Sequence, residues 1–229
     1  MFNSDVLSAI VQHAEAEFPK ESCGFVLNDE YVPIENVHDE PTKHFAIHPK
    51  EYINANRVST LQAIVHSHPN GELEPSWDDL QVQLKTNVPW VIAPKGSRLF
   101  WFGEGVPIEP LLGRTFRFNV QDCAVAARDW FYDKYQIKVN LPPRKAKWWK
   151  EDQYWAFNQL KECGFVAVSG DYLEGDILLM TIGSAVMSHL AVCLGGDKMY
   201  HHLVNSISKV EPIHNWKSCI VAHMRYTKW

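Results

Sequence analysis

The first twenty residues place apolar and polar side chains with the spacing of an amphipathic helix. Ser4 is suited to cap such a helix, and Pro19 lies just beyond its last apolar position. The apolar side chains recur every three or four residues, on what would be one helix face: Val6, Leu7, Ile10, Val11, Ala14 and Phe18. The pattern predicts that the chain opens with one helix packed against a core.

Short apolar runs dominate the sequence that follows. They have the length and the β-branched or aromatic content of strands: CGFVL, YVPIENV, QAIVHSH, PWVIAP and RLFWF. Helical stretches are expected after Pro49 and from Ser76. Residues 105–113 are rich in Gly and Pro and show neither the helical nor the strand spacing of apolar residues, which is typical of a linker. The sequence therefore predicts a mixed α/β domain over residues 1–104, followed by a linker.

Residues 114–229 have helices first and strands after them. Helices are expected at about 123–135 and 153–161. The strands that follow are DILLM, HLAVCL, KMYHHLV, ISKVE and CIVAHMRY, with GGDK as a hairpin turn. Helices followed by an antiparallel sheet indicate an α+β domain. The chain as a whole is predicted to be an α+β protein of two domains.

Composition excludes several classes of function. The 229 residues carry a formal net charge of −5, so the chain lacks the basic footprint of a nucleic-acid-binding protein. No apolar run approaches the roughly 18 residues needed to span a bilayer, and the start lacks the pattern of a signal peptide. The five cysteines are scattered without CxxC pairing, which favours free thiols in a reducing cytoplasm. We expect no nucleic-acid partner, no membrane span and no signal peptide.

Two histidines end the apolar run QAIVHSH. Because His66 and His68 are two residues apart, a strand places both on one face, which is a spacing suited to metal ligands. Imidazole suits zinc, and a catalytic zinc usually has three protein ligands. Asp79, in the S-x-x-D stretch that begins at Ser76, is the best third ligand, although a shift of one residue would replace it by Asp78. A capping box and polar residues at a strand end are the ordinary alternative.

The stretch HSHPNGELEPSWDD resembles the motif of the JAMM metallopeptidases. It has H-x-H-P, a gap of seven residues and S-x-x-D, and the resemblance covers about residues 1–104. It implies that His66, His68 and Asp79 bind Zn²⁺. It also implies that Glu21 moves a proton of the attacking water and that Ser76 stabilises the oxyanion. A domain that keeps the fold without the activity is the alternative.

Cys123 is the second candidate centre. It follows Asp122 at the predicted start of a helix, where the helix N-terminus and a nearby histidine are expected to favour the thiolate. His189 begins a predicted strand, and the hairpin after it returns His201 to the neighbouring strand, where it can orient His189. A small buried side chain is the usual role of a free cysteine, and we expect it for Cys163, Cys193 and Cys219.

The second half of the chain resembles the NlpC-type, papain-like cell-wall peptidases. It has Asp-Cys at a helix start, Gly-Asp before a strand, H-x-A-V-x-L-G, and a histidine twelve residues after the first. The resemblance covers about residues 112–229. It implies a papain-like domain with Cys123 as nucleophile, His189 as base and His201 as the third member. His202, the nearest competitor of His201, is expected to point to the opposite strand face.

The order of the two domains is similar to that of the tail-tip assembly proteins of lambda-like tailed phages. That resemblance implies a protein made in the host cytoplasm, located at the virion tail tip and acting at the host cell wall. Its expected partners are other phage tail-tip proteins, and its expected substrates are peptidoglycan stem peptides. The alternative is a structural tail-tip component in which one or both peptidase sites are inactive. A cellular isopeptidase is disfavoured, because the second domain resembles cell-wall enzymes.

Overall fold

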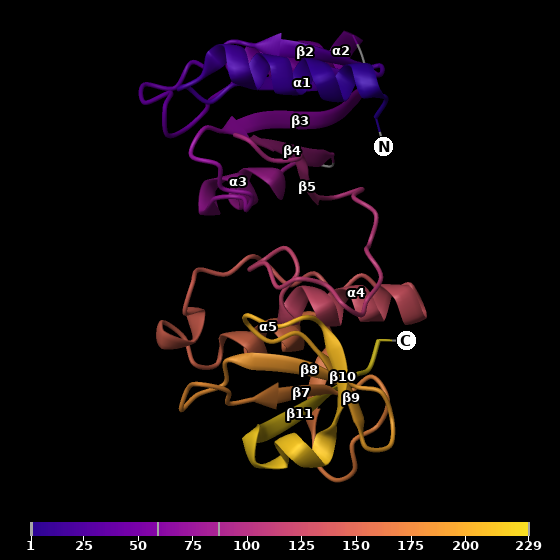
Figure 1. Ribbon diagram of the computed structural model, residues 1–229. Coiled ribbons are helices and arrows are strands. Elements are labelled where there is room, and N and C mark those ends of the chain that lie inside the picture. Colours follow the sequence, from indigo (N-terminus) through magenta and orange to yellow (C-terminus); the bar gives the residue numbers. More distant parts are fainter. Residues whose placement is uncertain (1, 59, 87, 229) are drawn as a thin grey trace. The chain divides into compact units, whose positions relative to one another are not determined.

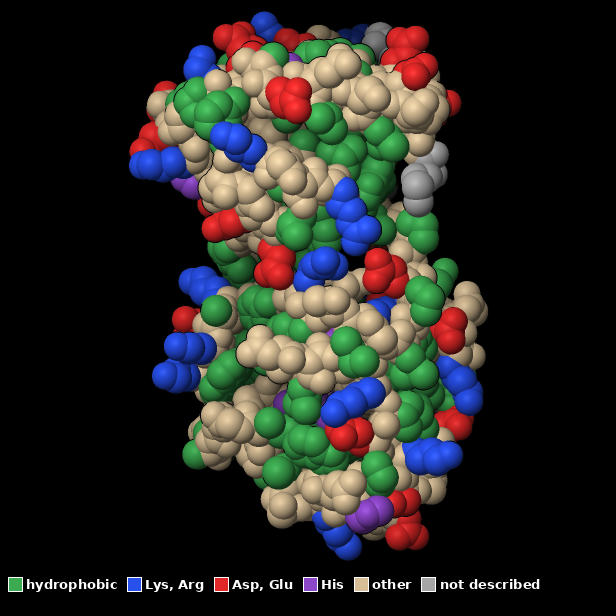
Figure 2. Space-filling view, viewed as in Figure 1, with side chains coloured by type: hydrophobic (Ala, Val, Ile, Leu, Met, Phe, Trp, Pro, Cys, Tyr) green, Lys and Arg blue, Asp and Glu red, His purple; other side chains and the backbone are tan. Residues whose placement is uncertain are grey.

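The protein is described by a computed structural model that covers residues 2–58, 60–86 and 88–228 (Figure 1). The chain divides into two compact units, Met1–Pro107 and Ile108–Trp229. Each unit has its own sheet and its own hydrophobic core. In the view of Figure 2, acidic and basic side chains are intermixed over the surface of each unit. None of the helices in the described part of the chain has the length and apolar composition needed to cross a membrane.

The first unit is a mixed α/β unit around a five-stranded sheet in the order β2-β1-β3-β4-β5. Strands β3 and β4 are parallel, and the other neighbours are antiparallel. The strands are β1 (Cys23–Leu27), β2 (Glu30–Ile34), β3 (Leu61–His68), β4 (Pro89–Pro94) and β5 (Phe100–Gly103). The helices are α1 (Ser4–Glu17), α2 (Pro49–Val58) and α3 (Trp77–Gln83). The expected helices and strands of this half are therefore present.

Helix α1 covers one face of this sheet. Its buried residues Val6 and Ile10 pack in one cluster with Ala63 and Val65 of β3. The N-cap is Asn3, whose side chain accepts the N–H groups of Asp5 and Val6 at 3.0 and 2.9 Å. The prediction of Ser4 as the cap is wrong, because Asn3 has the extended backbone of a cap and Ser4 is already helical.

Alternation along β3 decides which residues reach the other face of the sheet. Since Ala63 and Val65 point toward α1, Ile64, His66 and His68 point away from it. His66 pairs in register with Cys23 of β1 and with Ile92 of β4, so it lies in the middle of the sheet. Both histidines are therefore placed side by side at the carboxyl end of a central strand.

The second unit is rich in β structure, with an antiparallel six-stranded sheet in the order β10-β9-β8-β7-β11-β6. The strands are β6 (Phe165–Val168), β7 (Ile177–Met180), β8 (His189–Cys193), β9 (Lys198–His201), β10 (Lys209–Pro212) and β11 (Ile220–Tyr226). The helices are α4 (Cys123–Tyr135), η1 (Trp148–Lys150), α5 (Trp155–Glu162) and η2 (Ile213–Cys219). Strand β6 and the short helices η1 and η2 are additions to the predicted elements.

Two clusters of buried side chains stabilise the second unit. On one face of the sheet, Trp130 and Phe131 of α4 pack in one cluster with Leu190 and Val192 of β8. On the other face, Ala191 of β8 packs with a group completed by η2: Leu178, Met180, Cys193, Met199 and Ile213. Helix α4 is thus held against β8, which brings its first turn beside the start of that strand. The papain-like assignment of this unit stays a prediction.

Candidate functional sites

His66, His68 and Asp79 converge at the carboxyl end of β3. The two Nε2 atoms are 3.1 Å apart. Asp79 Oδ1 lies 3.4 Å from Nε2 of His66, and Oδ2 lies 3.6 Å from Nε2 of His68. All three side chains are buried, and their ligand atoms lie within 4.8 Å of one another. Two ligands of a tetrahedral Zn²⁺ are about 3.3 Å apart, given zinc–ligand bonds of about 2.0–2.1 Å, so this donor set fits zinc.

The start of α3 fixes the carboxylate of Asp79. The Asp79 N–H donates to Ser76 Oγ at 3.2 Å, and the Ser76 N–H donates to Asp79 Oδ2 at 2.7 Å. These two bonds are a capping box, so the ordinary explanation of S-x-x-D is correct. The same carboxylate also faces both histidines. Asp78 is exposed, and the structure therefore places Asp79 rather than Asp78 at the converging point.

Hydrogen bonding also sets the tautomer of His68. Its Nδ1 lies 2.9 Å from the carbonyl oxygen of Glu72. A carbonyl only accepts, so Nδ1 carries the hydrogen and Nε2 keeps its lone pair for a metal. The His66 ring stacks on Phe45 with centroids 4.5 Å apart, and its Nδ1 has no hydrogen-bond partner within residues 2–58, 60–86 and 88–228. The ring of His66 is thus positioned mainly by packing.

The electrostatics of the cluster favour an ionised carboxylate. Burial acts to raise the pKa of Asp79, but both histidines and the Ser76 side chain hold that pKa well below its usual range. Burial lowers the pKa of His66. Burial also acts to lower the pKa of His68, but hydrogen bonds to Asp79 and to the Glu72 carbonyl raise it overall. An anionic oxygen ligand therefore faces two imidazoles, which is the charge arrangement that a divalent cation requires.

Glu21 immediately precedes β1 and lines the same cavity as His68, Ser76 and Asp79. Burial raises the pKa of Glu21 to about 7, with His68 lowering it and Asp79 raising it in part. Its backbone is fixed, because its N–H donates to the Pro41 carbonyl at 2.7 Å and its carbonyl accepts from Asn36 at 2.9 Å. A carboxyl group with this pKa can both take and return a proton near neutral pH.

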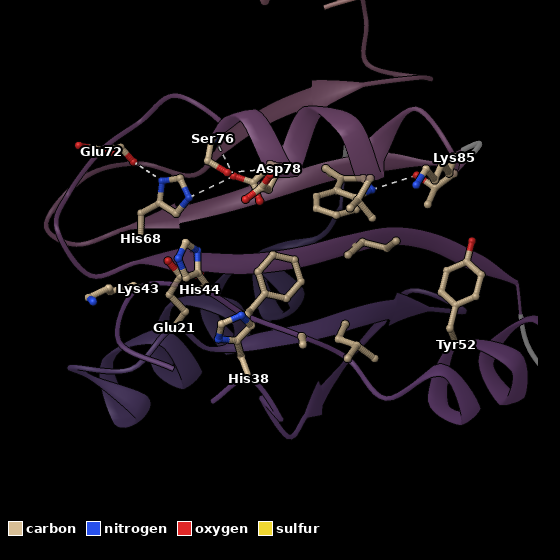
Figure 3. Close-up of a pocket in the computed structure, with 18 of the residues that line it drawn as sticks. Glu21, His38, Lys43, His44, Tyr52, His68, Glu72, Ser76, Asp78 and Lys85 are labelled. Atoms are coloured by element: carbon tan, nitrogen blue, oxygen red, sulfur yellow. Dashed lines mark hydrogen bonds and ion pairs between the residues drawn. The ribbon is translucent and has the colours of Figure 1, made fainter. Parts of the chain in front are cut away.

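These groups lie at one end of a cavity of about 650 Å³. Figure 3 shows Glu21, His68 and Ser76 around the same end, with α3 on one side. The segment 35–48 supplies several lining residues, among them His38, His44 and Phe45. Sequence reasoning missed this segment, since it has neither a strand nor a helix pattern to indicate where its side chains point.

The first turn of α4 carries Cys123. Asp122 is the N-cap, and its Oδ1 accepts the N–H groups of Ala124 and Val125 at 3.0 and 3.1 Å. Its Oδ2 accepts the Asn119 N–H at 2.7 Å and pairs with Arg144. Asp122 and Arg144 are both buried. This network fixes the helix start and, with it, the position of Cys123.

Burial and, to a smaller extent, the Asp122 carboxylate raise the pKa of the Cys123 thiol to about 11, against the opposing effect of Arg144 and of the N–H groups of Leu190 and Ala124. The expected lowering of this pKa is wrong, because a helix N-terminus cannot outweigh burial next to a carboxylate. The effect of the Leu190 N–H shows that the thiol lies beside the start of β8. Among the described residues, no hydrogen bond joins Cys123 Sγ to the His189 ring.

Three polar side chains on β8, β9 and β10 form a chain of hydrogen bonds. Nε2 of His189 lies 3.2 Å from Nδ1 of His201, and Nε2 of His201 lies 2.7 Å from Oε2 of Glu211. An ionised carboxylate only accepts, so His201 Nε2 carries a hydrogen and its Nδ1 accepts from His189. Nδ1 of His189 then keeps a lone pair. We call these three residues the histidine relay.

The pKa values in the relay agree with neutral imidazoles. Burial and, to a smaller extent, His201 and His202 lower the pKa of His189 to about 3. Burial also lowers the pKa of His201, against the opposing effect of Glu211. His202 lies apart from the relay, with its ring edge-on to Phe116 at a centroid distance of 5.3 Å. The structure thus pairs His189 with His201 rather than His202, and it adds Glu211, which sequence reasoning missed.

Comparisons with known proteins cover both units. The Prok-JAB family model, described as prokaryotic homologs of the JAB domain, matches residues 3–103. Tail tip assembly protein K of Escherichia phage N15 is 32% identical over 229 residues, which is 96% of this chain and 93% of that protein. The chain belongs to the tail tip assembly protein K family. The K protein of Escherichia phage lambda is 28% identical over 166 residues, covering 71% of this chain and 80% of its own length.

A bacterial relative matches part of this K-family chain. The probable TtuB-protein conjugate cleaving protease of Thermus thermophilus is 32% identical over 103 residues, which is 41% of this chain and 69% of that protein. The Prok-JAB match includes Glu21, His66, His68, Ser76 and Asp79. The first unit is therefore a JAB-like domain, and these five side chains lie within it.

Proposed function

We propose that the JAB-like unit is a zinc-dependent peptidase of the JAMM type. The observation that carries the proposal is the convergence of His66, His68 and Asp79 beside Glu21 and Ser76 at one end of a cavity. When bound, zinc polarises a carbonyl group and lowers the pKa of water to about 7. The similarity to the probable TtuB-protein conjugate cleaving protease of Thermus thermophilus favours hydrolysis of a peptide or isopeptide bond.

The side chains around the metal ligands have separate roles in this reaction. Glu21, with its pKa near 7, accepts a proton from the attacking water and returns it to the leaving amine. Ser76 Oγ accepts the Asp79 N–H, so its own hydroxyl hydrogen is available to the substrate carbonyl oxygen. The carbonyl carbon gains the water oxygen, and its bond to the amine nitrogen breaks.

Cleavage of a mixed peptide and isopeptide library, read by mass spectrometry, tests the zinc site. The full chain loaded with zinc is expected to release new fragments. Glu21→Gln keeps the three ligands but removes the base, so a rate at least a hundredfold lower is expected. Glu30→Gln, an exposed change on β2, is the matched control and should retain the rate. No cleavage by a zinc-loaded wild type, or an unimpaired Glu21→Gln, would contradict the proposal.

For the second unit we propose an NlpC-type cysteine endopeptidase that acts on peptidoglycan stem peptides. The supporting observation is the histidine relay beside the helix that begins with Cys123. With pKa values of about 11 and about 3, Cys123 and His189 are neutral thiol and neutral imidazole at pH 7. The proton must therefore move to His189 Nδ1 as the sulfur attacks the carbonyl carbon.

The remaining steps follow from that proton transfer. The sulfur–carbon bond forms, the carbon–nitrogen bond breaks, and the leaving amine takes the proton from His189. Water then hydrolyses the thioester and restores the thiol. Throughout, the relay binds Nε2 of His189, which leaves Nδ1 free to take the proton.

Purified peptidoglycan tests the cysteine site, with the released stem-peptide fragments separated and weighed. Wild type is expected to release fragments, whereas Cys123→Ala should release none. Cys163→Ala is the matched control, because Cys163 lies after α5 and its Sγ contacts the Asn140 carbonyl. Loss of activity in both variants, or in neither, would argue against Cys123 as the nucleophile.

The family membership supports a place for the chain in the phage particle. We propose that it is made in the host cytoplasm, joins other tail-tip proteins in the virion tail, and acts at the host cell wall. One observation favours the alternative of a structural component without activity at the second site: Cys123 is a partly buried thiol of high pKa. Phage carrying Cys123→Ala or Asp79→Ala distinguishes the enzymatic proposal from the structural alternative. If the protein is purely structural, these substitutions should leave assembly and infectivity unchanged.

A further inference from the structure

The lining of the cavity beside the candidate metal site is divided chemically. One end holds Glu21, His68, Ser76 and Asp79. The rest of the wall has a continuous apolar part, with Phe25, Phe45, Tyr52, Ile64, Val82 and Trp90, and a polar part that includes His38, Lys43, His44 and Lys85. Figure 3 shows Tyr52 at the end of the cavity away from His68 and Ser76. Apolar surface therefore begins next to the proposed catalytic groups and extends away from them.

Contacts within the protein hold this apolar wall in place. Phe45 stacks on His66 with ring centroids 4.5 Å apart, and Phe25 meets the Tyr52 ring edge-on at 6.2 Å. Trp90 is buried, and its Nε1–H donates to Thr86 Oγ1 at 3.0 Å. A wall that is already ordered does not lose conformational freedom when a ligand covers it.

The size and position of the cavity indicate its occupant. Its volume of about 650 Å³ lies within the range of about 300–1,000 Å³ that is usual for ligand sites. A polar side chain placed against the apolar part of this wall would lose its hydration without gaining partners there, whereas an apolar side chain would gain by leaving water. Because the wall is continuous with Glu21 and Ser76, the side chain that reaches it belongs to the peptide being cut.

We propose that the cavity is a specificity pocket for a bulky apolar side chain, of leucine or phenylalanine size, on the residue next to the bond that the zinc site cuts. The proposal rests on the proposed zinc peptidase function and adds a substrate class to it. Glycine at that residue leaves the wall uncovered, so ligands with a phenylalanine there bind at least tenfold tighter. Val82, on α3 at the cavity rim and 47% exposed, controls access to the wall.

Two amino-acid hydroxamates test the pocket on the zinc-loaded full chain, with affinities measured by calorimetry. Phenylalanine hydroxamate and glycine hydroxamate share one metal-binding group and differ in the side chain. Wild type is expected to prefer the phenylalanine compound at least tenfold. Val82→Trp places an indole over the apolar wall and should abolish the preference while keeping the affinity for the glycine compound. Leu84→Trp is the matched control, because Leu84 is 57% exposed at the end of the same helix and lies outside the cavity lining.

Equal affinity of zinc-loaded wild type for both hydroxamates, or a preference that survives Val82→Trp, overturns the pocket while leaving the zinc site intact. A second measurement needs no metal: in the metal-free chain, N-acetylphenylalaninamide should shift the NMR signal of the Trp90 indole N–H, and N-acetylglycinamide should not. If the chain binds no zinc, the proposed peptidase function fails. In that case the indole signal alone tests the pocket. A shift caused only by N-acetylphenylalaninamide supports the pocket, and the absence of a shift overturns it.

Discussion

Arg144→Met removes the cation that neutralises Asp122 under the first turn of α4. Both side chains are buried, with 3% of Arg144 and 1% of Asp122 exposed. Methionine keeps an apolar stem near Phe118 and Trp155, which flank the guanidinium at 5.6 and 5.5 Å. Breaking a buried ion pair costs about 3–5 kcal/mol, because the remaining charge is uncompensated. Three backbone N–H donors still reach Asp122, so we expect the lower figure, about 3 kcal/mol.

Hydrogen exchange of the α4 amides measures this loss for the second unit without interference from the first. A loss of about 3 kcal/mol corresponds to exchange about a hundredfold faster, since about 1.4 kcal/mol is a factor of ten. Arg128→Met is the matched control, because Arg128 is 44% exposed and pairs with Asp129 at 2.8 Å. Asp129 is buried but keeps its ion pair with Arg114, and a half-exposed partner such as Arg128 contributes about 1 kcal/mol or less, so exchange should rise by no more than about fivefold.

The double variant Asp122→Asn with Arg144→Met completes this test. The amide has no charge to leave unpaired, so the double variant should exchange more slowly than Arg144→Met alone. Equal exchange in Arg144→Met and Arg128→Met would refute the reasoning. So would a double variant that is no more protected than Arg144→Met.

Three further outcomes follow from other parts of the chain. Burial raises the pKa of Glu21 from 4.5 to about 7 in the metal-free protein, so its contribution to stability is full below about pH 4.5 and falls as pH rises through 7. Glu21→Gln should therefore gain about 3 kcal/mol over wild type at pH 8 and little at pH 4, and a gain independent of pH would contradict this. Glu211→Gln should lower kcat of the cysteine site at least tenfold, and Glu211→Asp should retain more of the kcat. An unchanged kcat in Glu211→Gln would show that the relay ends at His201. Gly24→Ala should destabilise the first unit by about 2 kcal/mol, because the new Cβ would lie 2.6 Å from the Val32 carbonyl oxygen. Hydrogen exchange of the β1 amides should therefore be faster. Unchanged exchange would mean that β1 and β2 can move apart without cost.

Local pattern was enough to predict the elements that carry the candidate sites. Alternation alone places His66 and His68 on one face of a strand, and the helix expected at 123–135 has those bounds in the structure. Asn3 and Ser4 are both able to cap α1, and only the backbone angles distinguish them. Strand β6 was missed because its four residues show no alternation, and its pairing with β11 joins segments far apart in sequence.

Features that depend on long-range packing were not readable from the sequence. Glu211 reaches His201 because β10 pairs with β9 in one particular register, which the sequence does not specify. The raised pKa of Cys123 has a similar origin. A helix N-terminus can be read from Asp122 and the apolar period after it, whereas burial against β8, which raises this pKa most, comes from a distant segment.

Zinc content of the purified full chain tests the central claim most directly. Wild type is expected to hold one Zn²⁺ per chain, bound by His66, His68 and Asp79. Asp79→Ala should lose the metal, and Asp78→Ala should retain it, because only the carboxylate of Asp79 faces the two histidines. A wild type without zinc, or an Asp79→Ala variant that keeps zinc while Asp78→Ala loses it, would contradict this assignment of the site.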